Sequence, residues 1–331
     1  MKKIFSAITL FCCLALTATA QQLRVHQGTV TYVYPASLLE TMTYTDGGQT
    51  LTILGRSFAT AEIDSIKVTN VPSTFTPNSL NVDYAGNRAN VTVSGDIAAL
   101  VTVGVDGANV SVLADAALQE EVTYTLSGTS GNGSFFMDGE FKSTVVLNNL
   151  NLTSTTGAAI DIENGKRIAL VLPEGTASTL ADAAGGTHKA CFFINGHAEF
   201  SGAGTLNLRG NTKHAYASDE YTQFKSSFGT FKVTSALSDG MHVEQYLQTD
   251  GGTFNISGVQ GDCIDVSATK DPLDVYNGQT FINAGTFVLN VAADDTKGIK
   301  SESDMAFNGG SITATVSGNG AKGISTGTHL T

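Results

Sequence analysis

Short alternations of apolar and polar residues recur at a nearly constant distance in the middle of the chain. Three of them open on a Gly-Thr step, at Gly204, Gly229 and Gly252, with spacings of 25 and 23 residues. Ten residues after each threonine, a small residue opens a second short run of the same kind. A unit of this length that holds two strands and no helical stretch is typical of a solenoid in which each unit forms one coil. We therefore expect an all-β solenoid.

The repeat continues in both directions. Units begin at Gly285 and Gly310 downstream, and Ala159 and Cys191 fit the second strand upstream. Because strand side chains alternate between two faces, equivalent residues of successive coils should stack into ladders. The second strands predict an internal ladder of Ile160, Phe192, Tyr216, Met241, Ile264, Ile299 and Ile324. The residues that follow these predict an exposed outer row of Asp161, Phe193, Ala217, His242, Asp265, Lys300 and Ser325.

The chain divides into three predicted parts. Residues 1–20 are predicted to be a signal peptide, because two lysines precede an apolar run and Ala-Thr-Ala suits cleavage, so the protein is expected to be secreted or held at the cell surface. Residues 21–88 alternate as half-buried strands without the repeat, and we expect an N-terminal β-rich cap over the first coil. Residues 89–331 form the predicted solenoid, whose last coil has no capping element, so we expect a longer protein beyond Thr331.

Two segments are longer than a turn requires, residues 173–189 and 268–278, and both are predicted to be loops on the binding face.

Cys191 and Cys263 hold equivalent positions three coils apart, about 14 Å at 4.8 Å per coil. A disulfide needs α-carbons within about 7 Å. We therefore expect two buried free thiols.

Composition and charge narrow the possible partners. The 36 glycines, 5 prolines and absence of tryptophan suit short strands with tight turns. Without Lys2 and Lys3 of the leader, 16 basic residues face 30 acidic ones, and the net charge changes from −12 to −14. Such a surface repels phosphate, so nucleic acid is a poor partner. No apolar run after the leader is long enough for a transmembrane segment, and the oligomeric state stays open.

Several aspartates precede or lie in the second strands of successive units. Stacked coils would place these carboxylates about 5 Å apart, where they repel unless a cation joins them, and oxygen-rich turns suit calcium. The alternative is that each Asp-Gly turn satisfies nearby backbone amides. The candidate metal ligands are Asp239, Asp262, Asp265, Asp294 and Asp295.

The histidines His188, His197, His214 and His242 show no metal-type spacing, so no zinc site is expected. Candidate carbohydrate contacts are Lys213, His214, His242 and Tyr246, and Tyr221 and Tyr276 are further tyrosines able to stack on sugar rings if exposed.

Several short motifs, in this order, resemble an exported bacterial carbohydrate-binding β-helix family. They are residues 211–215 (Asn-Thr-Lys-His-Ala), 297–301 (Lys-Gly-Ile-Lys-Ser) and 320–324 (Gly-Ala-Lys-Gly-Ile), with repeated Gly-Gly-Thr and Asp-Gly steps. The resemblance covers roughly residues 120–331. It implies a right-handed parallel β-helix, similar in shape to pectate lyases, that binds calcium and plant-type polysaccharides, with metal-binding roles for the five aspartates. The chain departs from the family's Asp-Asp-Gly-Ile at Asp262-Cys263-Ile264.

Three functions remain open from the sequence. The first is non-catalytic, calcium-dependent binding of acidic or cellulose-like polysaccharides. The second is a pectate-lyase-like enzyme, which needs a base, usually arginine, beside calcium-held uronate. Only Arg167 and Arg209 lie in regular units, and neither follows the acidic cluster. The third is a surface adhesin or structural solenoid.

Overall fold

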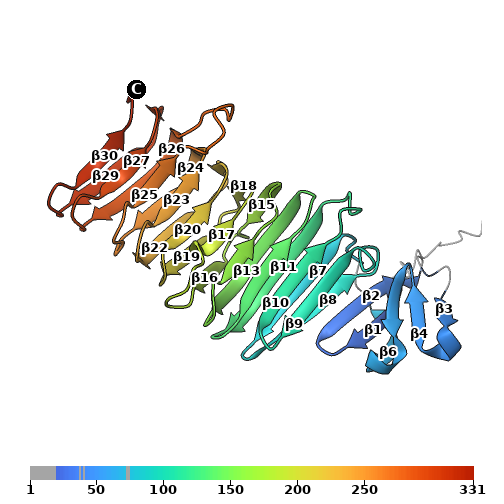
Figure 1. Cartoon of the computed structure of the whole chain (residues 1–331). Coiled ribbons are helices and arrows are strands. Elements are labelled where there is room, and N and C mark those ends of the chain that lie inside the picture. Colours follow the sequence, from blue (N-terminus) through green and yellow to red (C-terminus); the bar gives the residue numbers. More distant parts are fainter. Residues whose placement is uncertain (1–19, 37–38, 40–41, 72–74) are drawn as a thin grey trace, which may run out of the picture.

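The computed structural model describes residues 20–36, 39, 42–71 and 75–331, and Figure 1 shows an elongated body built from strands. The predicted signal peptide lies outside the described residues. Within the described residues the helical elements are two short 3-10 helices, Asp46–Gly48 and Thr60–Glu62. No helix in the described ranges has the length and apolar character needed to cross a membrane.

One sheet of ten strands runs along the body, and it is parallel except for its first pair. Each strand pairs with the equivalent strand of the next unit, which brings residues about 25 positions apart side by side. Its strands are β9 (Val101–Asp106), β10 (Asn109–Ala114), β12 (Ser134–Asp138), β14 (Ile160–Ile162), β17 (Ala190–Ile194), β20 (His214–Ser218), β23 (Met241–Glu244), β25 (Ile264–Ser267), β27 (Lys297–Ser301) and β30 (Lys322–Thr326).

The second sheet has 17 strands and contains two parallel columns. The first column holds β11 (Val122–Ser130), β13 (Ser143–Thr153), β15 (Arg167–Val171), β18 (His197–Ser201), β21 (Thr222–Phe224), β24 (Tyr246–Ile256), β26 (Gln279–Val291) and β28 (Met305–Phe307). The second holds β16 (Ala177–Ala181), β19 (Thr205–Gly210), β22 (Thr230–Ala236) and β29 (Ser311–Val316), together with the C-terminal halves of β13, β24 and β26.

The predicted fold class was correct as all-β but wrong as a right-handed parallel β-helix solenoid. Eight parallel strands pair in a closed ring, in the order β13, β15, β18, β21, β24, β22, β19, β16 and back to β13. The ring closes because β13 and β24 each continue through a bend, at Asn149 (φ 52°) and Gly252 (φ 96°), and take part in both columns. The connectivity is therefore that of a closed parallel barrel with extra strands.

The N-terminal strands also belong to the 17-stranded sheet. β1 (Ala20–Gln27) pairs antiparallel with β2 (Val30–Pro35) and β6 (Ser65–Val71), and β7 (Ser79–Ala85) pairs antiparallel with β8 (Arg88–Ser94). β7 also pairs in parallel with β11, which joins this region to the body. Alternating strands look alike in sequence whether their neighbours run parallel or antiparallel, so the pattern did not show this continuity.

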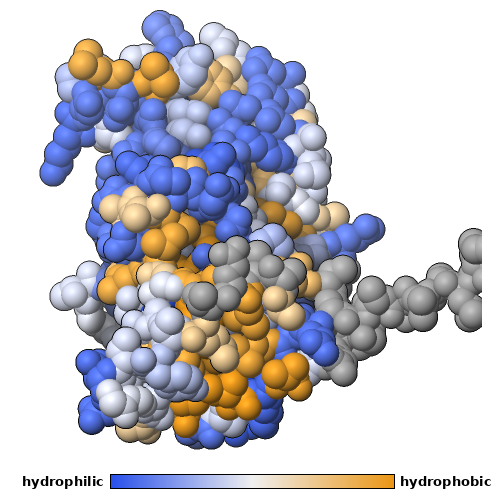
Figure 2. All heavy atoms as spheres, turned by 90° about the vertical axis from the view of Figure 1, so that its right-hand side faces the viewer, coloured by the Kyte–Doolittle hydropathy of each residue, from blue (hydrophilic) through white to orange (hydrophobic). Residues whose placement is uncertain are grey.

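A small antiparallel sheet, β3 (Met42–Thr45), β4 (Thr50–Ile53) and β5 (Arg56–Ala59), stands at the N-terminal end. Arg56 fixes it to the body, donating to the Tyr32 hydroxyl at 2.9 Å and to the Val101 carbonyl at 3.1 Å. Figure 2 views this end of the molecule and shows hydrophobic side chains gathered on the lower part of the face. In this region Met42, Tyr44, Ile66 and Val68 are exposed. Apolar side chains are therefore exposed at this end, and the cap predicted for residues 21–88 stays a prediction.

The predicted ladders are confirmed in register. The strand pairs align Ile160, Phe192, Tyr216, Met241, Ile264, Ile299 and Ile324 in order. The main apolar core runs from Leu23 to Met305, and Ala190, Phe193 and Ala217 form a smaller buried cluster. The outer row also keeps its predicted order, but its exposure was predicted wrongly, because Phe193, Ala217 and Asp265 are buried. The Lys189 ammonium lies 4.7 Å from the Phe193 ring centre and helps to cover it.

Cys191 and Cys263 are both free and buried, as predicted. The two predicted loops differ in outcome. Residues 268–278 form a loop between β25 and β26, whereas residues 173–189 contain β16, a strand that pairs with both β13 and β19.

Gly229 tests how closely the second column is stacked. A Cβ at this position would collide with the backbone of Ala203 and Gly204 in the previous unit. We expect Gly229→Ala to lower the free energy of unfolding by about 1–3 kcal/mol, the usual cost of overpacking, in urea denaturation followed by circular dichroism. Gly165→Ala is the matched control, because no atom lies within 4 Å of its added Cβ. Equal stability of the two variants would contradict the close stacking.

Candidate functional site

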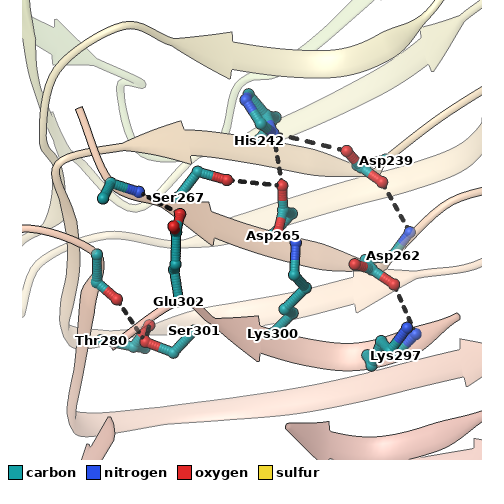
Figure 3. A network of polar contacts seen from close by, with 12 residues as sticks. Asp239, His242, Asp262, Asp265, Ser267, Thr280, Lys297, Lys300, Ser301 and Glu302 are labelled. Carbon is teal, nitrogen blue, oxygen red and sulfur yellow. Dashed lines mark hydrogen bonds and ion pairs between the residues drawn. The ribbon is translucent and has the colours of Figure 1, made fainter. Parts of the chain in front are cut away.

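Aspartates in successive turns accept hydrogen bonds from backbone amides of the next unit. Asp239 Oδ1 accepts the amide of Asp262 at 2.7 Å, and Asp262 Oδ1 accepts the amide of Lys297 at 2.7 Å (Figure 3). Asp294 Oδ1 accepts the amide of Asn319 at 2.8 Å in the same way. Asp239 and Asp262 are thus neighbours, as predicted. Each of the three aspartates accepts a hydrogen bond from a backbone amide, which is the alternative role that the sequence left open.

Basic side chains of the protein separate the acids of this row. His242 Nδ1 lies 2.8 Å from Asp265 Oδ2 and 3.6 Å from Asp239 Oδ2. The Lys300 ammonium donates to Asp265 Oδ1 at 2.8 Å. Figure 3 shows His242 and Lys300 on either side of Asp265. The repulsion expected between stacked carboxylates is therefore balanced by groups within the chain.

His214 belongs to the same cluster. Its ring is buried and stacks on His242 with ring centres 4.6 Å apart, and its Nδ1 lies 3.0 Å from Asp239 Oδ2. This pairing was not predicted, because the histidines show no metal-type spacing along the sequence. The signal was present in the register, because aligning Tyr216 with Met241 places position 214 opposite position 239.

The electrostatics of the cluster follow from these contacts. Burial opposes the charged form of His242, but the hydrogen bonds to Asp239 and Asp265 outweigh it and raise its pKa to about 9. Burial also opposes ionisation of Asp239, yet its two histidine partners hold its pKa below the usual range. Burial lowers the pKa of His214 against the pull of Asp239. His242 is therefore the charged histidine at neutral pH and His214 the neutral one.

A second group of side chains, which we term the aromatic platform, lies on the outer side of the first column of the 17-stranded sheet. His197, Tyr221 and Tyr246 stack in successive units, with ring centres 4.4 and 4.8 Å apart and interplanar angles of 17° and 20°. Tyr276 and Phe281 extend it, each meeting Tyr246 edge to face. Tyr276 comes from the loop at residues 268–278 and is 55% exposed. Because His197, Tyr221 and Tyr246 cover one another's faces and Tyr246 is buried, the row presents ring edges to solvent, and the exposed ring of the platform is Tyr276.

Polar side chains run beside the platform in the same register. Glu199, Gln223 and Gln248 occupy equivalent positions of β18, β21 and β24. Gln223 donates to the Tyr246 hydroxyl at 2.8 Å, which fixes that ring. A further amide row follows, in which Asn283 donates to Asp250 and Asn308 donates to Asn283, both at 2.8 Å. Rings flanked by amide and carboxylate groups are the combination that binds sugar faces and hydroxyls.

The predicted carbohydrate contacts do not share one surface. Tyr246 lies in the platform, His214 and His242 lie in the acidic cluster on the other sheet, and Lys213 is exposed in the turn before β20. The sequence analysis missed His197 and Phe281. His197, Tyr221 and Tyr246 are spaced by 24 and 25 residues, which is the repeat length, and this spacing is the signal that would have found the row.

The contacts of Arg167 and Arg209 show whether either could act as the base of a lyase. The Arg167 guanidinium donates to both carboxylate oxygens of Glu121, at 2.8 and 2.9 Å. A guanidinium held in this way is occupied as an ion-pair partner. Arg209 lies exposed at the end of β19, on a different sheet from the acidic cluster.

Asp161 opens the outer row and lines a cavity of about 220 Å³ together with Glu163, His188 and Lys189. Its Oδ1 is shielded from solvent and accepts no hydrogen bond within the described residues. Burial, together with the Glu163 carboxylate, raises the pKa of Asp161 from 3.8 to about 6. The folded protein therefore binds a proton here that the unfolded chain releases, and stability falls as pH rises through this range.

We expect Asp161→Asn to raise the urea midpoint at pH 8, where the wild-type carboxylate is charged and shielded, and to have a smaller effect at pH 4.5. Glu120→Gln, at an exposed acid, is the control and should shift neither midpoint. A gain of equal size at both pH values would show that the Asp161 charge is not its source.

A protein family and a solved structure are similar to the chain. No curated protein matches the chain. A solved structure described as a polysaccharide lyase-like protein from C. thermocellum, a gadolinium derivative, shares 21% identity, with a TM-score of 0.63 over 76% of this chain and 96% of that one. This likeness shows a shared fold. The family model for a carbohydrate-binding domain-containing protein matches residues 87–330, and the chain belongs to this family.

Proposed function

We propose that the chain is an exported, non-catalytic polysaccharide-binding protein whose aromatic platform is the glycan surface. The single observation that carries this proposal is the stacked row of His197, Tyr221 and Tyr246 on one outer face. The family supports binding of carbohydrate in general. The predicted leader at residues 1–20 supports export.

The repeat of the fold suits a polymer laid along the column. Successive strands lie about 4.8 Å apart, so each unit presents one ring and one amide or carboxylate at nearly the same distance. A chain of linked sugars has a similar repeat, and its residues would meet the same set of groups in each unit. Because the rings are held by their neighbours, little side-chain entropy is lost on binding.

The charge beside the platform favours neutral glycans. Glu199 lies in the polar row, and Tyr221 donates to it at 3.3 Å. Glu220 is close by, and burial together with Asp274 and other acids raises its pKa. The two cations beside the platform are each paired with an acid: the Lys225 ammonium with Glu199 at 3.2 Å, and Arg167, opposite His197, with Glu121 at 2.8 Å. A uronate polymer would meet net negative charge here, whereas a cellulose-like chain would not.

Lyase activity is the alternative. The structural neighbour is described as polysaccharide lyase-like, which favours this class by fold. Against it stands the ion pair of Arg167 with Glu121. One guanidinium nitrogen donates to both carboxylate oxygens, and a guanidinium held in this way is unsuited as a base. An assay for unsaturated uronate products on pectate separates the two functions.

The five predicted ligands do not fit calcium as one set. Calcium takes six to eight oxygen ligands, but the oxygens of Asp239 face two histidines and a backbone amide. Those of Asp265 face His242, Lys300 and Ser267. Asp262 and Asp294 each commit one oxygen to a backbone amide. Calcium dependence therefore remains a prediction from the family resemblance.

The platform is tested by removing its rings. We expect Tyr221→Ala and Tyr276→Ala each to weaken binding of a soluble β-glucan about 5- to 10-fold, because each loses stacking worth about 1 kcal/mol. Affinity electrophoresis or calorimetry measures the change. Tyr44→Ala is the matched control for Tyr276→Ala, since the two side chains are similarly exposed (59% and 55%) but Tyr44 lies at the N-terminal end. Unchanged affinity in both platform variants would contradict the proposal.

Chelation separates the platform from the acidic cluster. We expect binding of the neutral β-glucan to persist in excess EDTA, because no carboxylate pair in the platform depends on a bridging cation. Binding of polygalacturonate, which is repelled by a protein of net charge −12, should appear only with calcium. Loss of β-glucan binding on chelation would place the glycan at a metal site instead.

A further inference from the structure

We propose that His214, Asp239 and His242 bind a divalent transition-metal cation of the zinc class. His214 Nδ1 and His242 Nδ1 lie 3.0 and 3.6 Å from the same oxygen, Oδ2 of Asp239. All three candidate ligand atoms lie within 4.8 Å of one another. This proposal goes beyond glycan binding and concerns a different sheet from the platform.

The distances suit a small cation. A tetrahedral site with bonds of about 2.0–2.1 Å places its ligand atoms about 3.3 Å apart, and the two histidine-to-aspartate distances fall on either side of this value. The two rings lie nearly parallel, 17° apart, so their in-plane lone pairs lie in separate planes and do not converge on one point. His214 Nδ1 also accepts the Asp239 amide at 3.3 Å, a hydrogen bond that the metal would replace. Binding therefore requires one ring to tilt. His242, with 22% of its side chain exposed, is the freer of the two.

The donor atoms select the class of metal. Two imidazole nitrogens and one carboxylate oxygen suit zinc, copper or nickel, whereas calcium takes oxygen ligands. Three protein ligands leave the fourth position for water. The side of His242 that reaches solvent provides the access.

Neighbouring groups already hold the ligands in place. The amide of Asp262 donates to Asp239 Oδ1 and leaves Oδ2 directed at the histidines. His214 is 3% exposed and cannot leave the cluster without disturbing the core. Asp265 borders His242 and is itself fixed by Lys300 and Ser267. Such supporting contacts orient ligands and are part of a working metal site.

The test is titration of the full chain, freed of metal, with zinc chloride by calorimetry, and with cobalt followed by visible absorption. We expect one zinc per chain and the strong visible bands of four-coordinate cobalt. His242→Gln should weaken zinc binding by more than about 100-fold, the upper end of what losing a supporting residue costs. His188→Gln is the matched control, since His188 pairs with one carboxylate, Asp182, at 2.7 Å, and it should bind zinc as the wild type does.

Three outcomes overturn the proposal: no zinc bound at millimolar concentration, equal zinc affinity in His242→Gln and wild type, or calcium that displaces cobalt from the site. His214→Gln is a second variant, expected to lose zinc as well. Because His214 is buried, its thermal unfolding is measured first, and if it does not fold, His242→Gln at the partly exposed ring decides.

Discussion

Hydrogen bonding between equivalent residues of successive units is the constraint on which the rest of the structure depends. Once Tyr216 is aligned with Met241, and Met241 with Ile264, every other side chain of those strands has its neighbours fixed. Apolar residues gain from this arrangement, because each ladder buries a continuous surface. The stacked rings of Phe254 and Phe287, 4.5 Å apart, are one product.

The same constraint is costly for acids. An aspartate repeated in each unit meets its equivalent about 4.8 Å away, and two carboxylates at that distance do not both ionise freely. The chain solves this in two ways. In the turns, Asp239, Asp262 and Asp294 each turn one oxygen toward a backbone amide of the next unit. Within the strands, His242 and Lys300 occupy the positions on either side of Asp265, so the row alternates in charge.

The ladders could be predicted because they depend only on alternation and on a spacing of 23 to 25 residues. Ring closure could not, since the sequence shows breaks at Asn149 and Gly252 that look like turns between separate strands, whereas the chain continues there from one column into the other. The burial of Phe193 depends on Lys189, which packs over its ring. Asp239 and Asp262 were correctly predicted to be neighbours, but the basic side chains that pair with these acids were not considered. His242 was assigned to the outer row, yet its position between two aspartates was not used to neutralise them.

The two candidate surfaces differ in how much the fold prepares them. In the platform, each ring rests on the next, and Gln223 holds the Tyr246 hydroxyl, so the surface is formed before a ligand arrives. In the cluster of His214, Asp239 and His242, protonated His242 neutralises the carboxylates of Asp239 and Asp265. A metal cation must therefore displace the proton of His242, and one imidazole ring must tilt. Stacking thus favours flat, repeated ligands on one sheet and small, singly placed cations on the other. The difference follows from the residue repeated: an aromatic gains from a like neighbour, and an acid needs an unlike one.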